Sequence, residues 1–591
     1  MDRNEQLEKA NNLIAQKDFN SAKALLEELS GEYKNDAEIS KNLGLANVNL
    51  NLMDEAKANF ENVIAQNPED ATSYYYLGII YETQNDLQRS KSAYEKVITL
   101  RENYEDAYKN LCVIYLKLKE NENAEAAAKK AIEIDPENYQ GFHLLATALT
   151  AQKKYEEAID ALNKGIGLNP GNALMYNNLG SCYLGLNRLD MAEGAFNKAI
   201  ELTPENPTSH YNLASVLQLK NSYEEALEHY YTAYELEPTP FYLSAAALGA
   251  MYAQNWEKAI SLYQKLVTLQ PEKQNFQYNL ANAYIQTGKY QDAIMILKTL
   301  VTMNPKSVQM ALKLADCYQA AGDIASAQAV LANIIRLGKV PADIYYRYAI
   351  LCMKSGDIDK AETIFKKVIQ LEPNNAFAHK DLGIVYLAHR LFDEAEDEFK
   401  TALEISPEST SIIFEFANFY HNTNNYAKAE EMYAKALAKQ PENPDILTFA
   451  GLNLVSMNKN DEAQKLLSKA LENGAHNDTV FYNLGLIFYR KGEFENAKQF
   501  LLDAYSIYQG AETANLLALT FFEVKEYENA KNIVNKLLKD YPDNVNVLLL
   551  AAKIAIELTD AQKAEEYLEK IVKIFPDQPE AKKLYKKIKG V

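Results

Sequence analysis

The chain has 591 residues, of which 48% are apolar and 24% charged, and it contains only 22 Gly and 17 Pro. That composition favours a folded, mostly helical protein and argues against collagen-like, linker-rich, disordered and many-stranded β classes. The net charge of −20 opposes nucleic acid or anionic lipid as a partner, because neutralising phosphates needs a basic surface.

Targeting and redox signals are weak throughout the chain. Residues 1–20 carry four acidic side chains and no long apolar run, so we expect no secretory signal peptide. The most apolar run, 547–556, is short and contains Lys553, which argues against a membrane span. The four cysteines, at positions 112, 182, 317 and 352, form no CxxC pair, so neither a zinc site nor a disulfide framework is expected. We therefore expect a cytoplasmic protein.

A small residue recurs along the chain every 34 residues, with two steps of 33. It is Ala at sixteen of the seventeen sites and Ser at the other. The sites are Ala22, Ala56, Ser90, Ala124, Ala158, Ala192, Ala226, Ala259, Ala293, Ala327, Ala361, Ala395, Ala429, Ala463, Ala497, Ala530 and Ala564. A second small residue, such as Gly78 or Gly180, often lies twelve residues earlier, and Pro often lies twelve residues later.

Apolar residues recur at helical spacing on both sides of a short gap in each unit. The pattern therefore predicts two amphipathic helices per unit. We expect a small side chain at both recurring sites because the two helices cross closely there. The later Pro ends the second helix and turns the chain into the next unit.

This 34-residue helix–turn–helix pattern resembles the tetratricopeptide repeat (TPR) family, as in "NALMYNNLGSCYLGLNRLDMAEGAFNKAIELTPEN" from Asn172. The match covers residues 3–578 as seventeen units, fifteen of 34 residues and two of 33. The resemblance implies an all-α, right-handed superhelix (an α-solenoid) of about 17 repeats, whose concave wall is made by the first helix of each unit. Residues 579–591 are expected to form a C-terminal capping helix, with a basic anchor for an acidic partner or lipid as the alternative.

Three junctions depart from the pattern, near residues 239–241, 339–342 and 473–478. The first follows a Pro-Thr-Pro sequence, and the other two lack Pro at its usual place. Repeat drift explains these departures. The alternative is a change of superhelix curvature there, with hinges that divide the array.

No catalytic signature is present: there is no GxxxxGK[ST], no HExxH and no GxSxG after a strand pattern. His210 and His379 occupy packing positions of first helices, so we expect them in the core and not as ligands. The repeats account for residues 3–578 and leave no insert for a catalytic domain. We therefore expect a protein that is not an enzyme, with no catalytic, metal-binding or cofactor-binding residues and no cofactor.

Residues just before the earlier small site are expected to face the concave groove, and Asn and Tyr recur there. The candidate peptide-binding residues are Asn42, Asn110, Asn178, Ser181, Tyr211, Asn212, Ser215, Tyr278, Asn279, Asn282, Tyr482 and Asn483. An Asn amide donates to and accepts from a peptide backbone at once, and Tyr adds apolar area with a polar tip. The alternative, weighted equally, is that Asn there only stabilises neighbouring helices.

The Asn series resembles that of the TPR arm of O-linked N-acetylglucosamine transferases, whose catalytic domain is missing here. The leading hypothesis is a non-enzymatic scaffold that binds other proteins or extended peptides in its groove. The alternatives are a targeting arm for a separate enzyme, such as a glycosyltransferase, and a structural spacer without a ligand. The carboxylate clamp of chaperone-binding TPRs is not expected, because no three consecutive units supply its Lys and Asn pattern. Partner identity and oligomeric state are left open.

Overall fold

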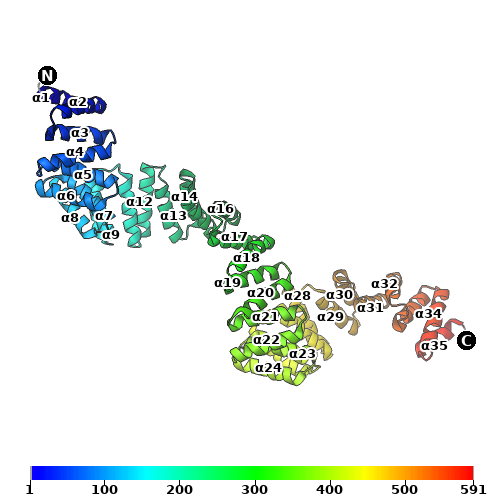
Figure 1. The fold of residues 1–591 in the computed structure, drawn as a ribbon. Coiled ribbons are helices and arrows are strands. Elements are labelled where there is room, and N and C mark those ends of the chain that lie inside the picture. Colours follow the sequence, from blue (N-terminus) through cyan, green and yellow to red (C-terminus); the bar gives the residue numbers. More distant parts are fainter. Residues whose placement is uncertain (1–2, 590–591) are drawn as a thin grey trace. The chain divides into compact units, whose positions relative to one another are not determined.

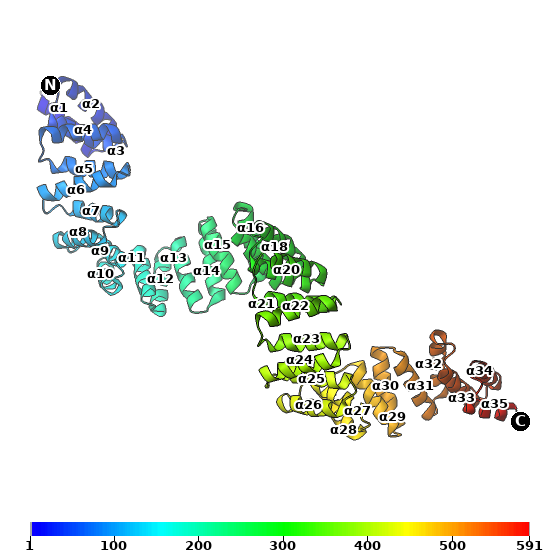
Figure 2. The ribbon, with the colours of Figure 1, turned by 60° about the horizontal axis from the view of Figure 1, so that its bottom comes forward.

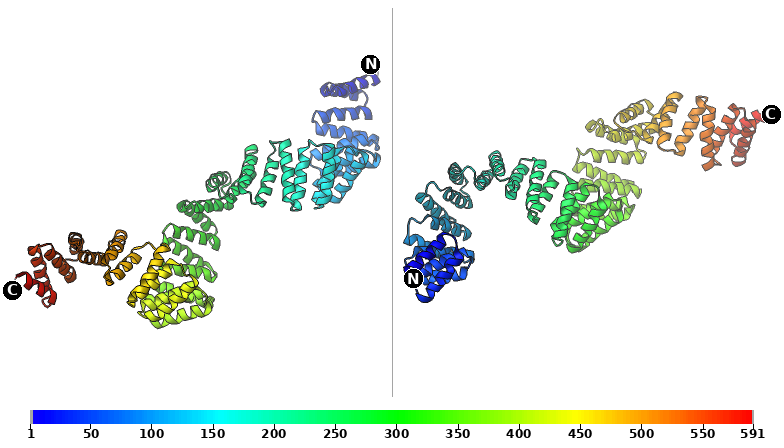
Figure 3. Two further views of the ribbon diagram at one scale, coloured as in Figure 1. Left: turned by 180° about the vertical axis from the view of Figure 1, so that it is seen from behind. Right: turned by 90° about the horizontal axis from the view of Figure 1, so that it is seen from above.

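The computed structural model describes residues 3–589, which form 35 α-helices (Figure 1). The chain divides into two compact units, one ending at Leu300 and the other starting at Val301, so that the boundary falls inside α18. Within each unit the helices lie one after another in chain order (Figures 2 and 3).

The helices of unit 1 are α1 (Arg3–Ala15), α2 (Phe19–Glu32), α3 (Ala37–Asn49), α4 (Met53–Gln66), α5 (Ala71–Thr83), α6 (Leu87–Leu100), α7 (Glu105–Lys117), α8 (Asn121–Ile134), α9 (Tyr139–Ala151), α10 (Tyr155–Leu168), α11 (Ala173–Gly185), α12 (Leu189–Leu202), α13 (Pro207–Leu219), α14 (Tyr223–Leu236), α15 (Pro240–Tyr252), α16 (Trp256–Leu269), α17 (Gln274–Gln286) and the start of α18 (Tyr290–Met303).

The helices of unit 2 that follow are α19 (Val308–Ala320), α20 (Ile324–Leu337), α21 (Ala342–Lys354), α22 (Ile358–Leu371), α23 (Ala376–Ala388), α24 (Phe392–Ile405), α25 (Thr410–Asn422), α26 (Tyr426–Lys439), α27 (Pro444–Ser456), α28 (Asn460–Glu472), α29 (Asp478–Arg490), α30 (Phe494–Ile507), α31 (Ala511–Glu523), α32 (Tyr527–Asp540), α33 (Val545–Glu557), α34 (Ala561–Ile574) and α35 (Pro579–Lys589).

Each repeat is an odd-numbered first helix packed against the even-numbered second helix that follows, which confirms the predicted helical pairs. Many first helices begin at an Asn or Asp whose side chain accepts backbone N–H groups, as Asn206 does from Thr208 and Ser209. The turn inside a pair contains one residue in the left-handed region, such as Asn85 (φ 59°) or Gly288 (φ 72°). Four prolines, Pro207, Pro240, Pro444 and Pro579, are the first residues of helices, and the others lie between helices.

The close crossing inside each pair explains the two small sites. A Cβ atom placed on Gly180 of α11 would come within 2.6 Å of the Phe196 ring on α12, and one on Gly78 within 2.6 Å of the Tyr94 ring. Both rings are fully buried, so they have little room to move. The small side chain therefore sets how closely the two helices pack.

The three irregular junctions differ from the other links between repeats in the residues that join one helix to the next. Residues 338–341 separate α20 from α21, and α28 is one residue shorter than most second helices and is followed by Gly474 at a φ of 96°. Pro240 begins α15 directly. A hinge at any of these junctions stays a prediction.

Helix α35 closes the array. Ala581 is fully buried, and Leu584, Tyr585 and Ile588 pack with Leu568 and Ile571 of α34, which confirms the predicted capping helix as far as Lys589. Gly590 and Val591, the last residues of that prediction, lie outside the described residues. None of the helices between residues 3 and 589 is long and apolar enough to cross a membrane.

We predict that Gly180→Ala and Gly194→Ala have opposite effects on stability. The new methyl at position 180 would collide with Phe196, whereas Gly194 lies exposed on α12 with no atom within 4 Å of its would-be Cβ. We expect Gly180→Ala to cost about 1–3 kcal/mol through overpacking, and Gly194→Ala to gain up to about 1 kcal/mol through helix propensity.

Hydrogen exchange of peptides from α11 and α12 measures this locally, which suits an array whose repeats need not unfold together. Faster exchange in Gly194→Ala than in Gly180→Ala would contradict the close-crossing argument.

Candidate functional site

The first helices of successive repeats present one common face to solvent. Counted from the earlier small site, positions −6, −3, −2, +1 and +5 fall within an arc of about 100° of the helix circumference at ~100° per residue. In α13, for example, these are Thr208, Tyr211, Asn212, Ser215 and Leu219. We call this face the first-helix wall.

The wall of unit 1 is built most regularly by α9, α11, α13, α15 and α17. From α7 to α15, consecutive first helices contact one another. Positions −6 and +5 are exposed in all five helices, and positions −3, −2 and +1 are mostly half-buried. The exposed residues are Gln140, Leu174, Thr208, Phe241 and Asn275 at −6, and Ala151, Gly185, Leu219, Tyr252 and Gln286 at +5. The wall thus consists of two rows of exposed residues, at positions −6 and +5, with mostly half-buried residues between them.

The predicted Asn residues lie on this face, but their amide N–H groups are used inside the protein. Asn42 Nδ2 donates to Asn11 Oδ1 at 2.7 Å, and Asn110 Nδ2 donates to the hydroxyls of Tyr75 and Tyr94 at 3.3 Å each. These partners lie in the preceding repeat, so the bonds join a first helix to the repeat before it.

The same holds for the remaining Asn residues at position −2. Asn178 Nδ2 lies 2.9 Å from His143 Nε2, and Asn212 Nδ2 lies 3.5 Å from Asn177 Oδ1. Further along, Asn279 Nδ2 donates to Tyr263 OH at 3.1 Å, and Asn483 Nδ2 donates to Thr479 O of its own helix at 2.8 Å. Except for the bond of Asn483, which stays inside α29, these contacts join neighbouring helices, as the alternative role of Asn expects.

Acceptor atoms remain on the wall. Within residues 3–589 no hydrogen bond reaches the Oδ1 atoms of Asn42, Asn110 or Asn178. Asn282 Oδ1 is buried and has no partner in the described chain. A polypeptide lying on the wall would therefore meet the Oδ1 atoms of Asn42, Asn110 and Asn178, which can accept its N–H groups. The buried Asn282 Oδ1 is not open to it.

The other candidates on α11 and α13 form a connected group. Ser181 Oγ donates to Asn177 O at 3.0 Å, and Ser215 Oγ donates to Tyr211 O at 2.9 Å while accepting from Tyr230 OH at 3.2 Å. Tyr278 on α17 is half-buried. Tyr482 and Asn483 belong to α29 in unit 2, so the structure does not place them in this group.

Sequence reasoning missed an apolar stripe on α15. Phe241, Leu248 and Tyr252 are 57%, 43% and 47% exposed and lie at i, i+7 and i+11 on the wall. The Tyr211 and Phe241 ring centroids are 5.0 Å apart, so the stripe continues onto α13. The signal in the sequence is the spacing of these three residues, which places them on one side of a helical wheel.

The wall of unit 2 has a different electrostatic character. Arg347 Nη1 lies 3.3 Å from Asp316 Oδ1, and Lys380 Nζ lies 2.8 Å from the buried Asp381, which also accepts from Tyr346 OH at 2.6 Å. A groove of about 280 Å³ lies between α23, α25 and α27, lined among others by Glu415, Asn418, His421 and Phe449.

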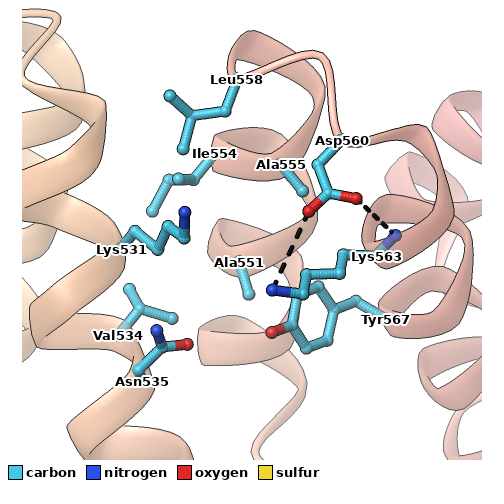
Figure 4. A pocket seen from close by; sticks show the side chains of 10 residues that line it. All are labelled: Lys531, Val534, Asn535, Ala551, Ile554, Ala555, Leu558, Asp560, Lys563 and Tyr567. Carbon is cyan, nitrogen blue, oxygen red and sulfur yellow. Dashed lines mark hydrogen bonds and ion pairs between the residues drawn. The ribbon is translucent and has the colours of Figure 1, made fainter.

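A smaller pocket between α32, α33 and α34 has room only for about one water molecule, with a volume of about 30 Å³ (Figure 4). Lys531, Val534 and Tyr567 line it, and the Asp560 carboxylate pairs with Lys563 at its edge. We therefore assign it to repeat packing.

The four cysteine thiols, which are nucleophiles or metal ligands in many proteins, are buried between packed helices here. Burial raises the pKa of the Cys112 thiol to about 12 and that of Cys317 to about 11, and the pKa values of Cys182 and Cys352 are also raised. Such thiols are poor nucleophiles. No group of three or more His, Cys, Asp or Glu side chains within residues 3–589 is arranged to hold a metal ion.

The two packing histidines sit at equivalent positions with different partners. His379 Nδ1 lies 2.5 Å from Glu398 Oε2 and its Nε2 lies 3.0 Å from Pro373 O, whereas His210 Nδ1 lies 3.0 Å from His229 Nδ1. The hydrogen bond to Glu398 raises the pKa of His379, and burial lowers the pKa of His229.

Four family models match, all described as tetratricopeptide repeat, and together they cover most of the chain. The matched residues are 250–307, 286–342, 353–401, 386–451 and 521–588 for one model, 48–104, 143–207 and 448–512 for a second, 105–138 for a third and 195–228 for a fourth. No curated protein matches the chain.

Solved structures of repeat proteins are similar at low identity. The APC/C hetero-tetramer Cut9–Hcn1 is 17% identical, with 82% of this chain and 96% of that chain covered and a TM-score of 0.35. A tetratricopeptide repeat protein from Parabacteroides merdae is 18% identical over 42% and 98% of the two chains, with a TM-score of 0.37. YrrB, described as a TPR protein with an unusual peptide-binding site, is 24% identical over 33% and 97%, with a TM-score of 0.28. None of these likenesses bears on the function of this chain.

We predict that His379 stabilises unit 2 more at acidic than at alkaline pH. Because the folded state raises the pKa of this histidine, its contribution is fully present below the unfolded value of about 6.5 and is lost as pH rises through the folded pKa. His379→Gln should lower the free energy of unfolding by about 1–2 kcal/mol at pH 5.5, the size of a charge-assisted hydrogen bond, and by less at pH 8.5.

Urea denaturation at both pH values measures the difference. Glu398→Gln is the matched variant, because it removes the other partner and should flatten the same pH dependence. An equal loss at both pH values would contradict the charged pair.

Proposed function

Because this chain belongs to the tetratricopeptide repeat family, whose members typically mediate interactions between proteins, we propose that it is a non-enzymatic scaffold. It binds partner proteins or extended peptides along the concave groove formed by its first helices. The wall of unit 1 is the part of the chain that we assign to this binding.

The single observation that carries this proposal is exposed apolar surface on a wall otherwise lined by amide and hydroxyl groups. Leu174 is 52% exposed on α11, and Phe241, Leu248 and Tyr252 form the stripe on α15. A contiguous apolar patch with a polar surround is typical of a protein-interaction site.

The twelve candidate residues take a revised role in this proposal. The amide nitrogens of Asn178 and Asn212 contact the preceding repeat. In this proposal the two residues therefore contribute to binding through their side-chain oxygens, which can accept hydrogen bonds. Replacing them would also weaken the contacts between repeats. The exposed apolar residues are the sharper test, since their side chains extend into solvent.

Two other functions give different outcomes in the same experiment. A targeting arm for a separate enzyme predicts that a transferase co-purifies with the chain. A structural spacer predicts no specific partner. Asn42, Asn110 and Asn178 make contacts between repeats, so they lend no separate support to a glycosyltransferase arm.

We predict that the double variant Leu174→Ala/Phe241→Ala loses partner proteins without unfolding. Burying two such side chains at an interface contributes enough that their loss should reduce recovery at least about five-fold. Affinity purification from the native cell, followed by quantitative mass spectrometry, measures recovery relative to the wild-type chain.

The matched control is Met191→Ala/Leu269→Ala, which truncates side chains that are 54% and 60% exposed on the second helices α12 and α16. The control should retain the partners. Equal recovery with the wall variant and the wild-type chain would refute binding at this wall.

A further inference from the structure

Five consecutive first helices in unit 1 contain no charged residue. Helices α9, α11, α13, α15 and α17 have 13 residues each and include no Asp, Glu, Lys or Arg. With 24% charged residues in the chain, a helix of this length would carry about three on average. An uncharged run of this extent is therefore a specific feature of this wall.

The second helices that alternate with them are charged, so the feature belongs to one face. Helix α14 carries four Glu, and α10 carries two Glu, an Asp and a Lys. First helices outside the run also carry charge, such as Glu105, Asp106, Lys109 and Lys117 on α7. Charge is thus absent only where the wall spans α9 to α17.

The histidine on the wall face of the run, His143, does not restore charge. Burial lowers the pKa of His143, which stands at position −3 of α9, so this histidine is neutral at pH 7. His210 of α13 is buried and contacts His229 and the Pro204 carbonyl.

Three cations in the turns after α9, α11 and α13 are paired, whereas Lys153, also in the turn after α9, is exposed and makes no ion pair within the described residues. Lys154 Nζ lies 2.9 Å from Glu125, Arg188 Nη2 lies 2.6 Å from Glu156, and Lys220 Nζ lies 2.6 Å from Asp190. Each bond reaches back to the preceding repeat. An anion bound at one of these three cations would have to compete with the carboxylate that already pairs with it.

A charged side chain held against this wall would lose hydration without gaining a partner of opposite sign. Burying an unpaired charge is costly, whereas an uncharged chain loses little and gains apolar contact. The wall therefore disfavours charged segments, because it has no countercharge for them, and favours uncharged segments through apolar contact. The stripe of Phe241, Leu248 and Tyr252 spans about 16 Å along α15 at 1.5 Å per residue and offers the largest apolar contact.

We propose that the wall from α9 to α17 takes an extended polypeptide segment without charged side chains, with a bulky apolar residue seated on the α15 stripe. This proposal rests on the proposed function and specifies its partner class. The Oδ1 atom of Asn178 accepts an N–H group of the segment, and Ser181 and Ser215 lie at the next wall position of their helices. A nucleic acid finds no basic residue on these five helices.

The test selects from a phage-displayed pool of random 15-residue peptides on the full chain at 150 mM NaCl. The enriched sequences are synthesised, and their Kd values are measured at 50 and 500 mM NaCl. We expect enriched peptides depleted in Asp, Glu, Lys and Arg, and Kd values that change less than about two-fold with salt.

Two variants locate the binding. Leu248→Glu places a charge on the stripe and should weaken these peptides at least about ten-fold, because it leaves an unpaired charge in the interface. Leu269→Glu is the matched control on the exposed end of α16 and should change Kd less than two-fold. Circular dichroism confirms that both variants are folded.

Each other outcome overturns the proposal in a recognisable way. Charged peptides whose binding weakens ten-fold with salt and is lost in Leu248→Glu would retain the wall as a binding site and refute its neutral partner class. Binding untouched by Leu248→Glu, or no peptide selected at all, would refute the proposed function as well. A dimer by light scattering that Leu248→Glu dissociates would show that a second copy of this chain occupies the stripe.

Discussion

The close crossing of two helices inside each repeat is the constraint on which the rest of the structure depends. The recurring Ala is fully buried at positions such as Ala22, Ala192 and Ala361, and a Cβ on Gly180 would collide with Phe196. A small residue at both ends of this contact fixes the distance and rotation of the pair. The opposite face of the first helix is then directed outward in every repeat, and that face is the wall.

The two helices of a repeat divide their roles. Second helices carry most of the charge in the middle of unit 1 and supply the carboxylates that pair with Lys154, Arg188 and Lys220 of the next repeat. Exposed pairs of this kind contribute little individually. Their effect here is on the surface, because they neutralise three cations in the turns beside the five uncharged first helices.

The repeating core was predictable because a period of 34 residues averages over many units. Helix pairs and junction prolines follow from local preferences, and the structure has them where the pattern indicates. The role of Asn178 was not predictable, since its partner His143 lies one repeat away and both roles suit the same residue type. The exposure of Phe241 was not predicted either, because an apolar residue on a first helix is usually expected to lie in the core.

The sequence by itself determined the family, the number of repeats and the absence of charge on five first helices, because these depend on residue type and spacing alone. Only the tertiary structure decided which of those uncharged side chains are available. Asn110 donates to two tyrosines of neighbouring helices, whereas Leu248 and Tyr252 extend into solvent. The physical reason is that hydrogen-bond partners and burial are set by the packing of one repeat on the next, which a single helix does not contain.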